Sequence, residues 1–151
     1  MNSKLLFSLF AACIFAAAPL SRAAEDTVLL NTLGYTTGQS VLLTHMAVGT
    51  LADAFVAKTY KSGEATTFVT TYINITNGMK GQMNKLLDAD TLSKEDAKFV
   101  SNTVDVLDLV LEESRALKEF VSSGDDADAQ AYDKARKKAL REIKTLLGMK
   151  D

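Results

Sequence analysis

Residues 94–121 read KEDAKFVSNTVDVLDLVLEESRALKEFV, and this stretch decides the fold. It is too long for a β-strand, which rarely exceeds about 10 residues. When successive residues are placed about 100° apart, as in an α-helix, the apolar ones gather on one face. They are Val100, Val104, Leu107, Val110, Leu111, Leu117 and Val121. Ser93, three residues before Asp96, matches a capping box, so we predict an amphipathic helix that begins here.

Three further segments have the same helical periodicity and are separated by short turn signals. They are residues 26–60, 65–87 and 126–147. Gly63, Gly124 and Gly148 stand where a left-handed residue is wanted after a helix ends. Short links between long helices make neighbouring helices antiparallel. The predicted fold is therefore all-α, an antiparallel up-down-up-down four-helix bundle.

Two stretches also tolerate β-structure. Residues 66–76 are rich in β-formers, above all threonine, and they are followed by Asn77-Gly78, a hairpin-type dipeptide. Residues 27–37 are β-tolerant as well. A minor alternative is therefore an α+β fold with a short hairpin from residues 27–37 and 66–76. We prefer a helix because the apolar stripe continues across the Asn-Gly pair at spacings of three and four residues.

The N-terminal segment has the pattern of a secretory signal peptide. A short basic start is followed by an apolar run over residues 5–20, and the small residues Ser21 and Ala23 fit a cleavage site. The run is shorter than the ~20 apolar residues that a membrane-spanning helix needs. We predict that residues 1–23 are cleaved as a signal peptide. The mature chain, residues 24–151, is then a single helical-bundle domain that is periplasmic or secreted and has no transmembrane segment.

The composition excludes several classes of function. The chain has 151 residues, which fits one domain, and its formal net charge of −2 gives no basic field that would recruit nucleic acid. One histidine and one cysteine are too few for a zinc finger, an iron–sulfur cluster or an intramolecular disulfide. No nucleophile elbow, phosphate loop or metalloprotease helix is readable. We therefore predict a protein that is not an enzyme, without a nucleic-acid partner or a metal site.

His45, the only histidine, is the residue on which a cofactor would depend. It falls inside the apolar stripe of the first predicted helix, about 40° from Val41. Reflecting the chain about the turn at Gly63 brings Met79 and Met83 to a similar height on the second helix. A histidine and a thioether that converge inside a bundle could form the axial ligands of a b-type haem. The competing interpretation, which we prefer, is a core histidine with gap-filling methionines and no cofactor.

Arg136 lies in the middle of the apolar stripe of the last predicted helix, at about the height of Leu111 and Glu112. A buried guanidinium needs a carboxylate partner. We therefore predict a structural ion pair between helices, from Arg136 to Glu112 or Asp108, which share one edge of the third helix.

The last predicted helix also has a basic outer face. It is formed by Lys134, Lys137, Lys138, Arg141 and Lys144. Such a run is usually a solvated face, supported here by an acidic residue four positions before one of the lysines. As an interaction face it would contact anionic lipid, a cell-wall polymer or an acidic partner protein.

Apolar residues also lie outside the main stripes of two helices. The first helix carries Leu29, Leu42, Leu43 and Met46 there, and the third helix carries Leu109 and Phe120. Water disfavours a second apolar sector, and a homodimer is the commonest way of covering one. We therefore predict self-association, with a partner protein or a central first helix as alternative covers.

These observations favour one class of function without identifying a ligand. The chain is predicted to be an exported, non-enzymatic interaction or small-ligand-binding module, whose partner is an unknown protein or small molecule. The alternative is a carrier of haem b or a metal that uses His45 with a core methionine.

Overall fold

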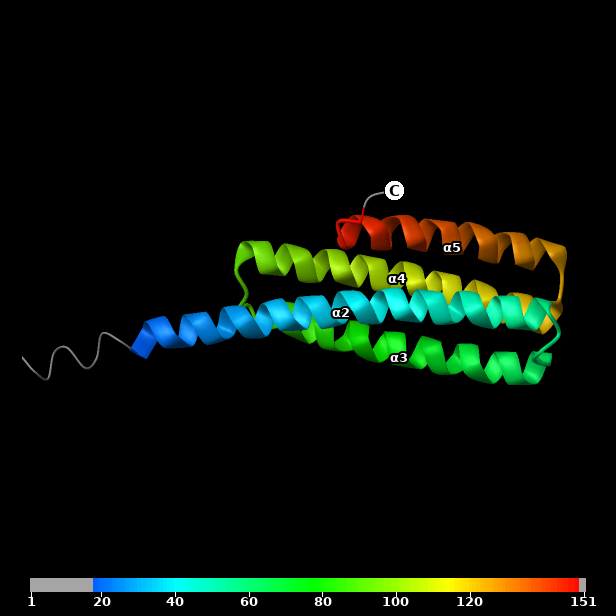
Figure 1. Ribbon diagram of the computed structural model, residues 1–151, viewed down its shortest axis with the longest axis horizontal. Coiled ribbons are helices and arrows are strands. Elements are labelled where there is room, and N and C mark those ends of the chain that lie inside the picture. The colour runs from blue at the N-terminus through cyan, green and yellow to red at the C-terminus, as the bar shows by residue number, and fades with distance from the viewer. Residues whose placement is uncertain (1–17, 150–151) are drawn as a thin grey trace, which may run out of the picture. The chain divides into compact units, whose positions relative to one another are not determined.

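The computed structural model describes the backbone of residues 18–149 and the side chains of residues 28–149. It contains the helices α2 (Ala18–Val56), α3 (Ser62–Asp88), α4 (Lys94–Ser123) and α5 (Asp126–Leu146), which Figure 1 shows. This described part of the chain has no β-strand. Residues 1–17, which hold most of the predicted signal peptide, lie outside the described residues.

The chain divides into two compact units, Met1–Tyr35 and Thr36–Asp151. In the first unit, the described residues form the beginning of α2, where the side chains of Val28, Leu29 and Tyr35 are exposed. In the second unit, the rest of α2 joins α3, α4 and α5 in a four-helix bundle. The predicted all-α bundle is therefore confirmed.

The stretches that tolerate β-structure are helical, and α3 runs without a break through Asn77-Gly78. Threonines fit into this helix because their hydroxyls donate to backbone carbonyls one turn earlier. Thr71 donates to the carbonyl oxygen of Thr67 over 3.1 Å, and Thr76 donates to that of Tyr72 over 2.8 Å. The α+β alternative with a hairpin from residues 27–37 and 66–76 is therefore wrong.

The ends of α4 and α5 follow the sequence pattern. The hydroxyl of Ser93 accepts a hydrogen bond from the Asp96 amide over 3.1 Å and donates to its carboxylate over 2.6 Å. Gly124 after α4 has a φ of 71°, and Gly148 after α5 has a φ of 64°. Both glycines occupy the left-handed region that a residue after a helix requires.

The end of α2 differs from the prediction. Gly63 lies in the first turn of α3, and the left-handed residue after α2 is Lys58, with a φ of 59°. The Lys58 amide donates to the carbonyl of Phe55, and the Thr59 amide donates to that of Ala54, each over 2.9 Å. These two bonds form a Schellman motif, which ends α2 before the predicted glycine is reached.

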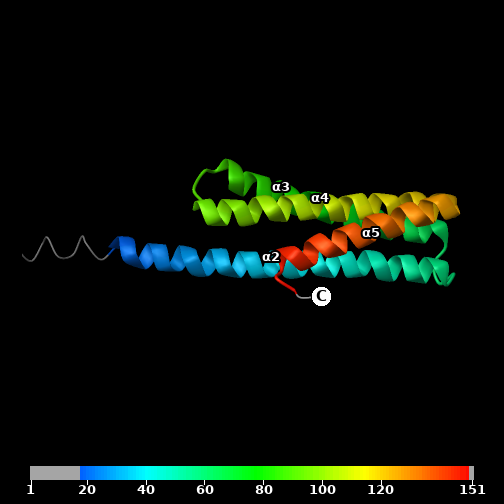
Figure 2. The ribbon, with the colours of Figure 1, turned by 90° about the horizontal axis from the view of Figure 1, so that it is seen from above.

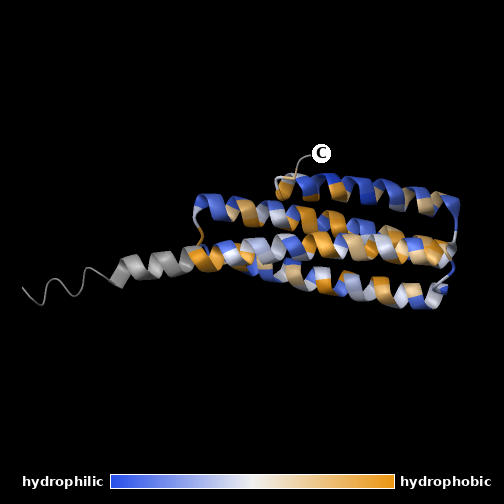
Figure 3. Ribbon diagram, in the orientation of Figure 1, coloured by the Kyte–Doolittle hydropathy of each residue, from blue (hydrophilic) through white to orange (hydrophobic). Residues whose placement is uncertain are grey.

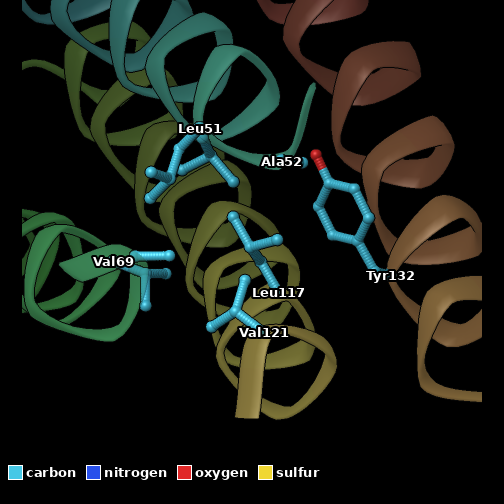
Figure 4. Close-up of a cluster of buried hydrophobic side chains, with 8 residues drawn as sticks. Leu51, Ala52, Val69, Leu117, Val121 and Tyr132 are labelled. Carbon is cyan, nitrogen blue, oxygen red and sulfur yellow. The ribbon is translucent and has the colours of Figure 1, made fainter. Parts of the chain in front are cut away.

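The core consists of two apolar clusters at different heights along the bundle. The first contains Leu51 and Ala52 of α2, Val69 of α3, Leu117 and Val121 of α4 and Tyr132 of α5, as Figure 4 shows. The second contains Val41 of α2, Met83 of α3, Val100, Val106, Leu107 and Val110 of α4 and Ile143 of α5. Helix α4 supplies more buried residues than any other helix, ten in all. Between the clusters, α2 buries the polar residue His45, and α4 buries Glu113 and Ser114.

Candidate functional site

The buried polar layer is built from His45 on α2 and Glu113 on α4. Nδ1 of His45 lies 2.8 Å from Oε2 of Glu113, and the two side chains are 5% and 0% exposed. A hydrogen bond of this length that involves a carboxylate is of the strong, charge-assisted kind. The second carboxylate oxygen, Oε1, has no hydrogen-bond partner among the described residues. The pair therefore joins α2 to α4 in the middle of the core, closed off from solvent.

Burial and the histidine act on Glu113 in opposite directions. Burial raises the pKa of its carboxyl above the ordinary value of 4.5, while the hydrogen bond and the charge of His45 lower it. The positive charge of Arg136 lowers it further, by the smallest of these effects. An isolated carboxylate in such a place would instead take up a proton. The arrangement can therefore hold one proton between the imidazole and the carboxylate.

Helix α5 reaches this layer through Tyr132 and Arg136. The guanidinium of Arg136 lies over Gly49 of α2, where a Cβ atom would stand 2.6 Å from Nη2. Nη1 of Arg136 is 4.0 Å from a carboxylate oxygen of Asp53. The hydroxyl of Tyr132 is buried, and burial raises its pKa, while the neighbouring Arg136 acts to lower it. Gly49 thus leaves the space that lets a cation of α5 pack on α2.

The carboxylates that we predicted as partners of Arg136 pair with lysines instead. Glu112 accepts a hydrogen bond from Lys138 over 2.9 Å, and Asp108 accepts one from Lys80 over 2.5 Å. Both carboxylates are half-exposed, on sides of α4 that face α5 and α3, whereas Arg136 turns toward α2. The predicted ion pair of Arg136 with Glu112 or Asp108 is therefore wrong, because the arginine crosses to a different helix.

The two methionines that we considered as haem ligands lie in the second apolar cluster. Met83 is buried there and Met79 is partly buried, and the cluster includes Val41 and Leu107. Packing among aliphatic side chains is how methionine usually fills a core. His45 lies between the clusters and uses Nδ1 to bond Glu113.

The predicted basic face on α5 is largely neutralised by nearby acids. Lys137 bonds Asp133 over 2.5 Å, and Arg141 bonds Glu142 over 2.9 Å. Lys138 is held by a carboxylate of α4, and Lys144 also has a partner. Lys134 is exposed. The face therefore presents less positive charge to a partner than the sequence indicates.

A groove opens between α4 and α5. Figure 2 shows that α5 diverges from α4 toward the C-terminal end of α5. Beyond that end, Leu147 packs on Gly38 of α2, where a Cβ atom would stand 2.6 Å from Cδ2 of the leucine. The space left behind has a volume of about 740 Å³. Its apolar walls are Phe99, Val106 and Leu109 of α4 and Leu146 of α5, and charged residues of both helices surround them.

Sequence reasoning missed Glu113 and found the groove only in part. Glu113 lies between Val110 and Leu117 in a series of buried residues that begins at Val106, with spacings of four, three and four residues. This helical spacing could have indicated that Glu113 is buried. Leu109 was recognised as an apolar residue outside the main stripe. No sequence pattern indicated that α5 would diverge from α4 and leave a groove between the two helices.

The described residues contain no group of three or more histidine, cysteine, aspartate or glutamate side chains that could hold a metal ion. None of the helices in the described part of the chain combines the length and the hydropathy needed to cross a bilayer. Comparison with known proteins found no matching family model, curated protein or solved structure.

Proposed function

We propose that this chain is an exported, non-enzymatic binding protein that holds an elongated apolar or amphipathic small molecule in the groove between α4 and α5. The groove is the observation that carries the proposal. Its volume of about 740 Å³ falls in the range typical of small-molecule sites, roughly 300–1,000 Å³. Apolar walls with a few polar groups around them are also typical of such sites.

The surroundings of the groove indicate which part of a ligand would bind where. Phe99, Leu109 and Leu146 would contact an alkyl chain or another apolar body. Lys98 and Asp105, which also line the groove, offer one charge of each sign to a head group. We therefore expect every ligand of the groove to have an apolar chain. The experiment below determines which head-group charge is preferred.

Binding is tested with two surfactants that share one alkyl chain, dodecanoate and dodecyltrimethylammonium, titrated calorimetrically below their micelle concentrations. We expect at least one of them to bind, and Leu109→Lys to weaken that binding at least about tenfold, because a charge in the groove must be desolvated. The matched control is Leu140→Lys, which lies on α5 outside the groove. Equal binding by both variants, or no binding of either surfactant to the wild type, would contradict the proposal.

Export rests on the N-terminal sequence. The basic start, the short apolar run and the small residues before Ala24 support cleavage after Ala23. We expect the intact mass of the periplasmic or secreted product to correspond to a chain that begins at Ala24. A mass that retains residues 1–23 would show that the proposed processing is wrong.

A further inference from the structure

The charged residues of the bundle are distributed unevenly among its helices. The part of α2 over residues 36–52 contains no aspartate, glutamate, lysine or arginine, and neither does the part of α3 over residues 65–79. Helices α4 and α5, by contrast, carry charges along their whole length. In Figure 3, α5 is mostly blue, whereas the middle of α2 is mostly orange and white. The middle parts of α2 and α3 therefore have no charged side chains of their own.

The uncharged parts of α2 and α3 share one surface. A hollow of about 240 Å³ is lined by Ala47, Thr50 and Leu51 of α2 together with Phe68 and Tyr72 of α3. The two uncharged segments therefore line the same hollow.

Large apolar side chains are exposed on this surface. Leu43 is 63% exposed and Met46 is 56% exposed on α2, while Phe68 is 42% exposed and Ile75 is 55% exposed on α3. Leu43 and Thr50 are seven residues apart, as are Phe68 and Ile75, so each pair lies along one side of its helix. We name the surface formed by Leu43, Met46, Thr50, Phe68, Tyr72 and Ile75 the α2–α3 face.

We propose that the α2–α3 face is a docking surface for a second copy of this chain, paired face to face about a two-fold axis. Interface cores are depleted of charged residues, and this face has none. In a two-fold pairing each face meets its own copy, so no charge on either partner is buried without a counter-charge. A partner of a different chain would need an equally uncharged surface, which a second copy supplies by symmetry.

A membrane surface fits this face less well. Helices that lie on membranes combine an apolar face with lysine and arginine along the polar side, which attract anionic lipid headgroups. The segments that form the α2–α3 face contain neither residue.

The size of the face sets the expected strength of the dimer. Seventeen residues of α2 extend about 25 Å, and two adjacent helices are about 20 Å wide. A face of about 500 Å² in projection is small for a specific interface, since a standard one buries roughly 800 Å² of accessible surface per partner. We therefore expect a reversible dimer with a dissociation constant in the micromolar range. This proposal is independent of the ligand groove, which lies between the other two helices.

The test is sedimentation velocity of the processed, exported protein over a range of micromolar concentrations. We expect a concentration-dependent dimer, and we expect Leu43→Glu or Ile75→Glu to raise its dissociation constant at least about tenfold, because each variant places like charges across the interface. Leu140→Glu on α5 is the matched control and should dimerise like the wild type. Circular dichroism of each variant checks that the helices are intact.

Three outcomes would overturn the proposal. One is a wild-type protein that stays monomeric at all these concentrations. Another is a dimer that is disrupted by Leu29→Glu, in the first unit, and not by Leu43→Glu or Ile75→Glu. The third is a monomeric wild type that binds phosphatidylcholine–phosphatidylglycerol vesicles and loses that binding in Leu43→Glu, which would assign the face to a lipid surface.

Discussion

A variant with leucine in place of His45 is expected to lose about 3–5 kcal/mol of unfolding free energy at neutral pH, because it leaves the buried carboxylate of Glu113 without its partner. The carboxylate is 0% exposed, and the described residues offer its second oxygen no hydrogen bond. Urea unfolding followed by circular dichroism measures this loss. A loss below about 1 kcal/mol would mean that the hydrogen bond between the two side chains contributes little.

The unfolding free energy that His45→Leu loses should depend on pH in a defined direction. Burial raises the pKa of the Glu113 carboxyl above 4.5, so the folded chain holds this proton more tightly than the unfolded chain. The contribution of Glu113 to stability is therefore greatest below about pH 4.5 and is lost as the pH rises through the raised pKa. His45 lowers that pKa, so in its absence the pKa is higher still. The contribution of Glu113 to stability is then lost over a range that extends to higher pH. The destabilisation in His45→Leu should accordingly be largest at neutral pH and smaller in acid.

A double variant separates the charge from the packing. When His45 and Glu113 are both replaced by leucine, no charge is left in the layer, and much of the stability lost in His45→Leu should return. The single variant Glu113→Leu should cost less than His45→Leu, because a neutral imidazole is cheaper to bury than a carboxylate. If the double variant were as unstable as the sum of the two single variants, packing rather than charge would be the cause.

The second large effect is expected at Leu117 of α4. This side chain is 0% exposed in the first apolar cluster, so Leu117→Ala should cost about 2–5 kcal/mol through the cavity that it leaves. Leu109→Ala, on the same helix, changes a wall of the groove and should cost at most about 1 kcal/mol. Both values come from urea unfolding. Equal losses in the two variants would mean that the groove is filled in solution.

Most of the fold could be predicted from the sequence because it depends on local periodicity. The predicted helix over residues 94–121 corresponds to Lys94–Ser123, and the serine cap and two of the three left-handed glycines are where the pattern puts them. The end of α2 could not be predicted in this way. It ends because the backbone adopts a left-handed conformation at Lys58, and a lysine gives no signal for that conformation.

The polar contacts were less accessible to sequence reasoning because they depend on how the helices are rotated. Arg136 was expected to be buried, but its side chain is 38% exposed, and its partners were assigned to α4 when they lie on α2. A rotation of one residue on α4 separates the half-exposed Glu112 from the fully buried Glu113. Heights along a bundle can be estimated by counting residues, whereas a difference of about 100° around a helix axis decides which of two adjacent glutamates enters the core.

The residues that anchor α5 have a consequence for how the bundle opens. Its buried residues are Tyr132, Ala135, Ala139 and Ile143, two of which are alanines, whereas α4 buries ten residues. The ion pairs that join α5 to its neighbours are partly exposed and contribute little. Less apolar area must be exposed to detach α5 than to pull out α4, so its amide hydrogens should exchange through a local opening that leaves the other helices folded. Because α5 is also one wall of the groove, the same opening is a physical route by which a bulky ligand could enter.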